Sequence, residues 1–216
     1  IFDHVERTAD RSIAQTFDER LKFAAAADAA GIYCLHVAEH HATPLNLVPV
    51  PGVYLGALAR ATKRMRIGPL VYLLTLVSPL RLAEEICILD HLSNGRLEVG
   101  VGRGVSPYEL AYHKVAAAES RDIFIDAFNC LSAALTNDMF SHTGPHYSYK
   151  DVPMALRPLQ QPVCHPDGVI PQRLPLVLLV PDVRALEQWD HQPLRLHEHK
   201  LWSADLRFHG NRFLPD

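Results

Sequence analysis

The feature that most constrains the fold of this chain is a repeated alternation of helix-forming and strand-forming segments. Residues 16–30 place apolar side chains at helical spacing, Gly31 is a residue type that commonly ends helices, and the run 32–38 is rich in β-branched and aromatic residues. The alternation continues with helices expected at 53–62, 79–92 and 121–135 and with strands at 65–73 and 96–102. Apolar strands separated by helices predict a parallel sheet covered by helices. Both a doubly wound sheet and a (β/α)-barrel satisfy this pattern.

The end of the chain has a different character, because residues 151–216 hold nine of the sixteen prolines. The segment 146–162 predicts a short β ribbon followed by an extended connection, and 174–180 predicts one more strand. Beyond it, 183–189 predicts a helical turn, and no helical or strand period is sustained after that. We therefore expect two regions, residues 1–162 as the α/β portion and residues 163–216 as a divergent or irregular segment. A native, a truncated and a frame-shifted origin of this segment all remain open.

Composition limits the classes of protein to which the chain can belong. At 216 residues it can form one large or two small domains, and its 48% hydrophobic and 21% charged residues are typical of a globular protein. The net charge of -3 argues against nucleic-acid binding, and no apolar run reaches membrane-spanning length. We expect a cytoplasmic protein. Its four cysteines are far apart and are expected to be free thiols. They are Cys34, Cys87, Cys130 and Cys164.

The densest chemical signal is the stretch His36-Val37-Ala38-Glu39-His40-His41. Its first five residues spell H-x-x-E-H, a signature of one class of zinc hydrolases. In a helix, residues four positions apart lie on the same face, but in a strand they lie about 13 Å apart, too far for one metal ion. Because the preceding residues predict a strand, we expect no metal site here. The zinc hydrolase is kept as the less favoured alternative.

Chemically active residues follow several of the expected strands, and carboxyl ends of parallel strands form the active-site face of such folds. His40 and His41, preceded by Glu39, are of a type that serves in general acid–base catalysis. After the strand 96–102, the turn Gly102-Arg103-Gly104 permits close approach of backbone to a ligand, and a guanidinium binds phosphate. A tight turn with a solvated arginine is the alternative interpretation of the same residues. Ser106-Pro107 is expected to start a short helix whose N–H groups favour an anion.

Taken together, the segments "AEHHATPLNLVPVP", "RMRIGPLVYLLTLVSPLRLAEEICILDHLSNGRLEVGVGRG" and "SPYELAY" resemble the bacterial luciferase-like flavin monooxygenases over residues 1–162. The resemblance implies a (β/α)8 TIM barrel that is incomplete in this chain. Residues 1–4 match the tail of a truncated first strand, and the C-terminal units are missing or divergent. It also implies oxygenation of a small organic substrate with reduced FMN and O2, a deazaflavin being the alternative cofactor. A non-catalytic flavin-binding or scaffold relative is the alternative function.

The resemblance also assigns roles to individual residues. His40 matches the catalytic histidine of the family, with His41 beside it, and Glu39 is expected to contribute to the cofactor site. Leu70-Val71 match the position at which the family often has a non-prolyl cis peptide against the flavin ring. Gly102 stands where bacterial luciferase has a cysteine, and Arg103, with Gly104, matches a residue that holds the FMN phosphate. A flavin reductase partner and a homodimer are implied as well.

Overall fold

The computed structural model describes residues 1–160 and 176–179, and the structural statements that follow concern these residues. Six short parallel strands run through them. One group pairs in the order β1 (Phe2–Asp3), β2 (Cys34–Val37) and β3 (Arg66–Pro69). A second group pairs in the order β4 (Tyr72–Leu73), β5 (Val99–Gly102) and β8 (Leu176–Leu179). The strands are close to the predicted ranges, and β8 confirms the strand predicted at 174–180.

The two groups of strands are joined through backbone hydrogen bonds between β3 and the residues that lead into β5. The Ile67 N–H donates to the Arg96 carbonyl at 3.0 Å, and the Glu98 N–H donates to the Ile67 carbonyl at 2.9 Å. The prediction of a single strand at 65–73 is wrong in one respect, because Leu70 and Val71 separate β3 from β4. The peptide bond between these two residues is cis, which interrupts the extended backbone.

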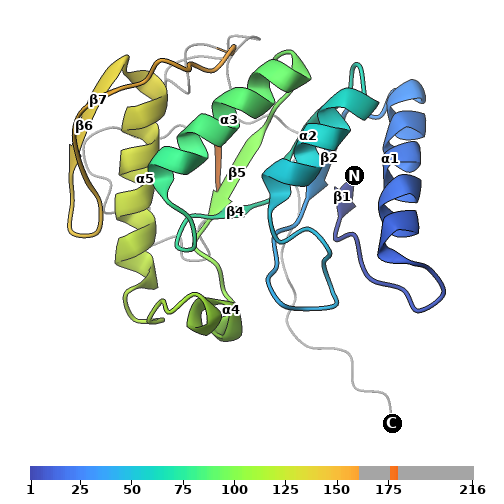
Figure 1. Ribbon diagram of the computed structural model, residues 1–216, viewed down its shortest axis with the longest axis horizontal. Coiled ribbons are helices and arrows are strands. Elements are labelled where there is room, and N and C mark those ends of the chain that lie inside the picture. Colours follow the sequence, from blue (N-terminus) through green and yellow to red (C-terminus); the bar gives the residue numbers. More distant parts are fainter. Residues whose placement is uncertain (161–175, 180–216) are drawn as a thin grey trace.

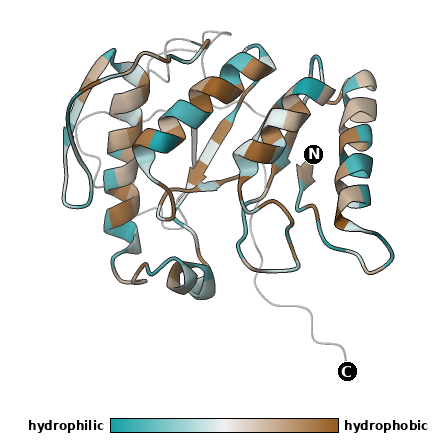
Figure 2. Ribbon diagram, in the orientation of Figure 1, coloured by the Kyte–Doolittle hydropathy of each residue, from teal (hydrophilic) through white to brown (hydrophobic). Residues whose placement is uncertain are grey.

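Four long helices lie side by side over one face of the sheet (Figure 1). They are α1 (Ile13–Ala29), α2 (Pro51–Ala61), α3 (Pro79–Ser93) and α5 (Ser120–Thr136). Apolar side chains on alternate strand positions, such as Leu35, Val37 and Val101, are fully buried beneath these helices. Figure 2 shows the apolar residues distributed over the helices and along β5. Among the described residues the helices cover one face of the sheet, which favours the barrel over a doubly wound sheet, where both faces are covered.

Local sequence signals explain where these helices begin and end. Two of them, α2 and α3, have proline in their first turn, a position where the missing N–H costs no hydrogen bond; these prolines are Pro51 and Pro79. Helix α1 begins with a capping box between Ser12 and Gln15. The positive φ of Gly31, 84°, confirms the predicted stop after α1, and Asn94 ends α3 in the left-handed region.

A β ribbon packs beside α5; its second strand lies within the segment 146–162 predicted to form a ribbon, but its first strand precedes that segment. It consists of β6 (Met139–Thr143) and β7 (Ser148–Pro153), which pair in antiparallel fashion. The buried carboxylate of Asp126 on α5 binds the His142 ring at 2.7 Å and the N–H groups of His146 and Tyr147 at 2.8 Å each. These bonds hold the ribbon against the helix.

The architecture is therefore that of a (β/α)8-type barrel, of which the described residues form a part. The helical turn predicted at 183–189 and most of the irregular segment 163–216 lie outside the described residues, so the boundary near residue 162 stays a prediction. Cys34, Cys87 and Cys130 are free and buried, as expected, and Cys164 lies outside the described residues. None of the helices described is long and apolar enough to cross a membrane.

Candidate active site

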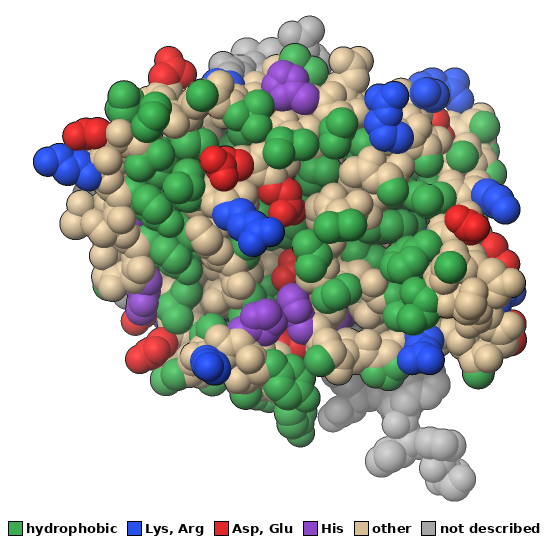
Figure 3. All heavy atoms as spheres, viewed as in Figure 1, with side chains coloured by type: hydrophobic (Ala, Val, Ile, Leu, Met, Phe, Trp, Pro, Cys, Tyr) green, Lys and Arg blue, Asp and Glu red, His purple; other side chains and the backbone are tan. Residues whose placement is uncertain are grey.

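The loops that follow β2 and β5 meet at the carboxyl ends of the parallel strands, next to the short helix α4 (Pro107–Tyr112). Histidine side chains gather at the lower part of the face shown in Figure 3. His40 Nδ1 lies 3.1 Å from Oε1 of Glu109, and the backbone N–H of His41 donates to the same oxygen at 2.9 Å. One buried carboxylate on α4 thus positions both histidines of the loop after β2.

A second carboxylate–histidine pair lies beneath the first. His41 Nε2 is 2.9 Å from Glu39 Oε1, and the other Glu39 oxygen accepts the Leu73 N–H at 3.2 Å. Burial raises the pKa of Glu39. The hydrogen bond to Glu39 raises the pKa of His41, and burial lowers the pKa of His113, whose ring contacts His41 edge-on at 4.5 Å. Both groups of the Glu39–His41 pair therefore have pKa values raised above those they have in water.

The two histidines differ in their access to a substrate. The His40 side chain is 34% exposed and its ring stacks on His4, whereas the His41 side chain is 16% exposed and is bound to Glu39. Because Nδ1 of His40 contacts Glu109, Nε2 is the nitrogen that remains for a reacting molecule. This arrangement of an oriented, accessible imidazole is the one that general acid–base catalysis requires.

The Leu70–Val71 peptide, expected at the cofactor site, lies at the same edge of the sheet. It is cis, as the resemblance implies, and the Leu70 N–H donates to the Val37 carbonyl at the end of β2 at 2.8 Å. Gly100 of β5 faces this segment so closely that an added Cβ would lie 2.7 Å from the Pro69 carbonyl oxygen. The absence of a side chain at Gly100 is therefore what allows this segment to pack on β5.

The turn Gly102-Arg103-Gly104 is held by its backbone, which leaves the arginine side chain to bind other groups. The Gly102 carbonyl accepts the Leu74 N–H at 3.0 Å, the Arg103 carbonyl accepts the Thr75 hydroxyl at 2.8 Å, and Gly104 has a φ of 83°. The half-buried guanidinium of Arg103 donates to the Ser120 hydroxyl at 3.2 Å, and it contacts no carboxylate within the described part of the chain. Its charge is thus available to an anion.

The sequence alone did not indicate the roles of two residues of this site, Glu109 and Gly100. Glu109 stands three positions after Ser106, a spacing that predicts a local capping box, and the Ser106 hydroxyl does accept the Glu109 N–H at 3.3 Å. The Glu109 carboxylate, however, reaches His40, 69 positions away. Gly100 was predicted only as one residue of the strand 96–102. The short helix α4 uses one of its N–H groups for this cap, so the anion role expected for Ser106-Pro107 stays a prediction.

The H-x-x-E-H stretch does not form a metal site in the described structure. His36 lies within β2 and contacts Cys34 and Glu98, whereas Glu39 contacts His41 and His40 contacts Glu109. Only His36 lies in the strand, and Glu39 and His40 lie in the loop that follows it, so the three side chains reach different neighbours. The zinc hydrolase alternative therefore finds no support.

A partial (β/α) barrel with polar loops at the carboxyl ends of its strands has the architecture of α/β-barrel enzymes. Comparison with known proteins identifies the family. The luciferase-like monooxygenase family model matches residues 1–176, and the chain belongs to this family. The uncharacterized protein y4wF of Sinorhizobium fredii is 42% identical over 166 residues, which cover 77% of this chain and 48% of that protein.

Two further relatives have named activities. The oxygenase component of the flavin-dependent trigonelline monooxygenase of Acinetobacter baylyi is 29% identical over 166 residues, covering 75% of this chain and 46% of that protein. The crystal structure of monooxygenase RslO1 from Streptomyces bottropensis has a TM-score of 0.73 at 26% identity and covers 82% of this chain and 52% of that one. The chain spans about half the length of the curated relatives it matches.

Proposed function

We propose that this chain is part of a flavin-dependent monooxygenase that inserts one atom of O2 into an organic substrate, with the other atom leaving as water. The observation that carries the proposal is the partly exposed His40 imidazole, bound to the buried Glu109 at the carboxyl ends of the strands. Membership of the family and the flavin-dependent oxygenase among the relatives support it.

The described residues suit a flavin or deazaflavin cofactor in their chemistry. Arg103, whose charge no carboxylate of the described residues neutralises, would bind the phosphate together with the Gly104 backbone. Leu70 and Val71 would contact the ring, and Glu39 would support this wall through the Leu73 N–H. When bound, a reduced flavin supplies the two electrons that activate O2. We propose FMN as the cofactor, with a deazaflavin as the alternative.

The protein residues have separate roles in this proposal. His40 holds or donates a proton at Nε2, and Glu109 keeps its ring in place through Nδ1. His41 keeps the loop in position through Glu39, and this hydrogen bond raises the pKa of His41, which favours its protonated form near the reacting groups. A flavin reductase is the proposed source of reduced FMN, a homodimer is the proposed assembly, and the cytoplasm is the proposed location.

Anaerobic titration of the purified chain with reduced FMN, and in parallel with reduced deazaflavin, tests the cofactor. We expect Arg103→Met to weaken FMN binding by about tenfold or more, the loss expected for a charge-assisted phosphate contact. Riboflavin, which lacks the phosphate, should bind Arg103→Met as well as it binds wild type. The exposed Arg60 on α2 provides the matched control, Arg60→Met. Equal FMN affinity in Arg103→Met and wild type would contradict the phosphate assignment.

The role of His40 is tested by admitting O2 to the complex with reduced FMN and following flavin absorbance and oxygen uptake. We expect His40→Ala to slow the reaction by about 10²-fold, the scale of general acid–base catalysis. His146→Ala, a change at an exposed position on the ribbon, should leave the rate unchanged. FMN binding with equal rates in wild type and His40→Ala would indicate a non-catalytic flavin-binding relative instead.

A further inference from the structure

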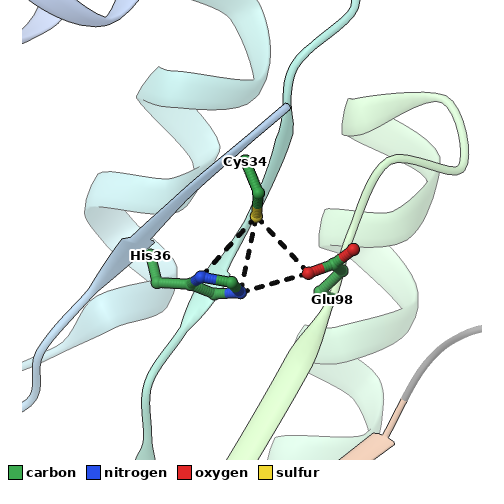
Figure 4. A group of neighbouring side chains, drawn as sticks. All are labelled: Cys34, His36 and Glu98. Carbon is green, nitrogen blue, oxygen red and sulfur yellow. Dashed lines mark hydrogen bonds and ion pairs between the residues drawn. The ribbon is translucent and has the colours of Figure 1, made fainter. Parts of the chain in front are cut away.

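A cluster of metal-ligating side chains lies on the face of the sheet opposite the helices, apart from the residues assigned to the flavin. Cys34 and His36 occupy alternate positions of β2, so they point to the same face, whereas Leu35 and Val37 point into the core under the helices. Glu98 immediately precedes β5 and reaches the same place. Figure 4 shows the three side chains directed toward one another.

The distances within the cluster are those of ligands around one small ion. Cys34 Sγ lies 3.4 Å from His36 Nε2 and 3.4 Å from Glu98 Oε2, and His36 Nε2 lies 3.2 Å from Glu98 Oε2. Zinc binds sulfur at about 2.3 Å and nitrogen or oxygen at about 2.0 Å, so tetrahedral geometry places such atoms about 3.3–3.6 Å apart. In the described part of the chain this is the one group of three such residues whose ligand atoms all lie within 4.8 Å of one another.

Hydrogen bonds from neighbouring side chains orient Glu98 as a ligand. Its Oε1 accepts Arg66 Nε at 2.5 Å and the Tyr33 hydroxyl at 3.4 Å, which leaves Oε2 directed at Cys34 and His36. Hydrogen bonds of this kind orient ligands in known metal sites.

We propose that Cys34, His36 and Glu98 form a binding site for one zinc-like divalent ion, with a water molecule as the fourth ligand. Zinc is favoured over magnesium or calcium because thiolate and imidazole are softer ligands than oxygen. On binding, the Sγ–H bond of Cys34 breaks, its proton passes to the buffer, and the sulfur lone pair binds the ion. The thiolate and the carboxylate are then the two negatively charged ligands of the metal.

The proposal replaces the expectation from sequence that the chain has no metal ligands. It shares only His36 with the H-x-x-E-H stretch and implies no hydrolase activity. It is also independent of the proposed function, since none of its three ligands is assigned to the flavin or to proton transfer. Failure of the metal test would leave the flavin proposal intact, and the converse also holds.

The test uses the full chain without a histidine tag, treated with chelator and then titrated with Zn²⁺ by calorimetry. We expect wild type to bind one ion per chain. Cys34→Ser and Glu98→Gln should each bind zinc at least about 100-fold more weakly, because loss of a direct ligand should cost more than the 10–100-fold typical of residues that only support the ligands. Cys130→Ser, a buried thiol on α5, is the matched control for Cys34. Residues 163–216 also contain Cys164, His197 and His199, which are residue types that bind zinc. The combined variant Cys164→Ser, His197→Ala, His199→Ala, called the C-terminal variant, should retain binding.

Cobalt substitution gives a readout that does not depend on any variant. Co²⁺ bound to Cys34 should produce a thiolate-to-cobalt charge-transfer band in the near ultraviolet together with visible bands of tetrahedral intensity. Binding without the thiolate band, unchanged affinity in Cys34→Ser, or loss of binding in the C-terminal variant alone would each overturn the proposal. Absence of zinc binding by the correctly folded wild-type chain would do the same.

Discussion

Replacement of Gly100 by alanine tests the close packing that shapes the cofactor edge of the sheet. The added methyl group would lie 2.7 Å from the Pro69 carbonyl oxygen, 3.2 Å from Leu70 Cδ1 and 3.3 Å from Val71 Cγ1. The nearest atom belongs to the backbone, which cannot move aside as a flexible side chain can. We therefore expect the segment 69–71 to be displaced from β5 or the sheet to be strained.

The size of the effect follows from two opposing contributions. Forcing an extra methyl group into a packed region costs about 1–3 kcal/mol. Alanine loses less conformational freedom on folding than glycine, which offsets about 0.4–1 kcal/mol. We expect Gly100→Ala to lower the free energy of unfolding by about 1–2 kcal/mol, equivalent to a shift of about 0.5–1 M in the urea midpoint.

A matched glycine separates the packing effect from the general effect of the substitution. Gly56 lies within α2, and a Cβ added there would meet nothing within 4 Å. Gly56→Ala should therefore raise stability by up to about 1 kcal/mol, the difference in helix propensity between the two residues. Urea unfolding followed by circular dichroism measures both variants. A Gly100→Ala protein as stable as wild type would refute the argument.

Two further predictions concern buried ionisable groups. Asp28 accepts the N–H groups of Lys63, Arg64 and Met65 at 2.6–3.0 Å, and although burial alone would raise its pKa, these bonds lower it. Asp28→Asn should lower the free energy of unfolding by about 2–4 kcal/mol at neutral pH, measured from urea midpoints. This difference should fade below about pH 3.9, as pH falls through the folded-state pKa of Asp28. An unchanged urea midpoint at pH 7 would contradict the prediction. The raised pKa of His41 means that its stabilising effect is complete below about pH 6.5 and is lost as pH rises through the folded-state value. The stability difference between wild type and His41→Gln should therefore shrink as pH rises above about 6.5, and a constant difference would show that the charge of His41 is not involved.

The sequence by itself determined the elements whose signals lie within a few residues of one another. Apolar residues at helical spacing, Pro79 at a first helical turn and Gly31 after a last turn encode local backbone geometry, so the helices are close to their predicted ranges. The run 174–180 encodes β8 in the same way. The position of His40 directly after a strand was also enough to place it at the carboxyl edge of the sheet.

Only the tertiary structure decided which distant residues meet. Cys34 and Glu98 are 64 positions apart, and His40 and Glu109 are 69 apart, so their contacts depend on strand register and on the path of the loops. No local pattern encodes such a pairing, because each partner satisfies its own local signal equally well: Glu109 is read as part of a helix cap and Cys34 as a buried strand residue. The break between β3 and β4 has the same origin, since it requires Gly100 on another strand to leave room for it.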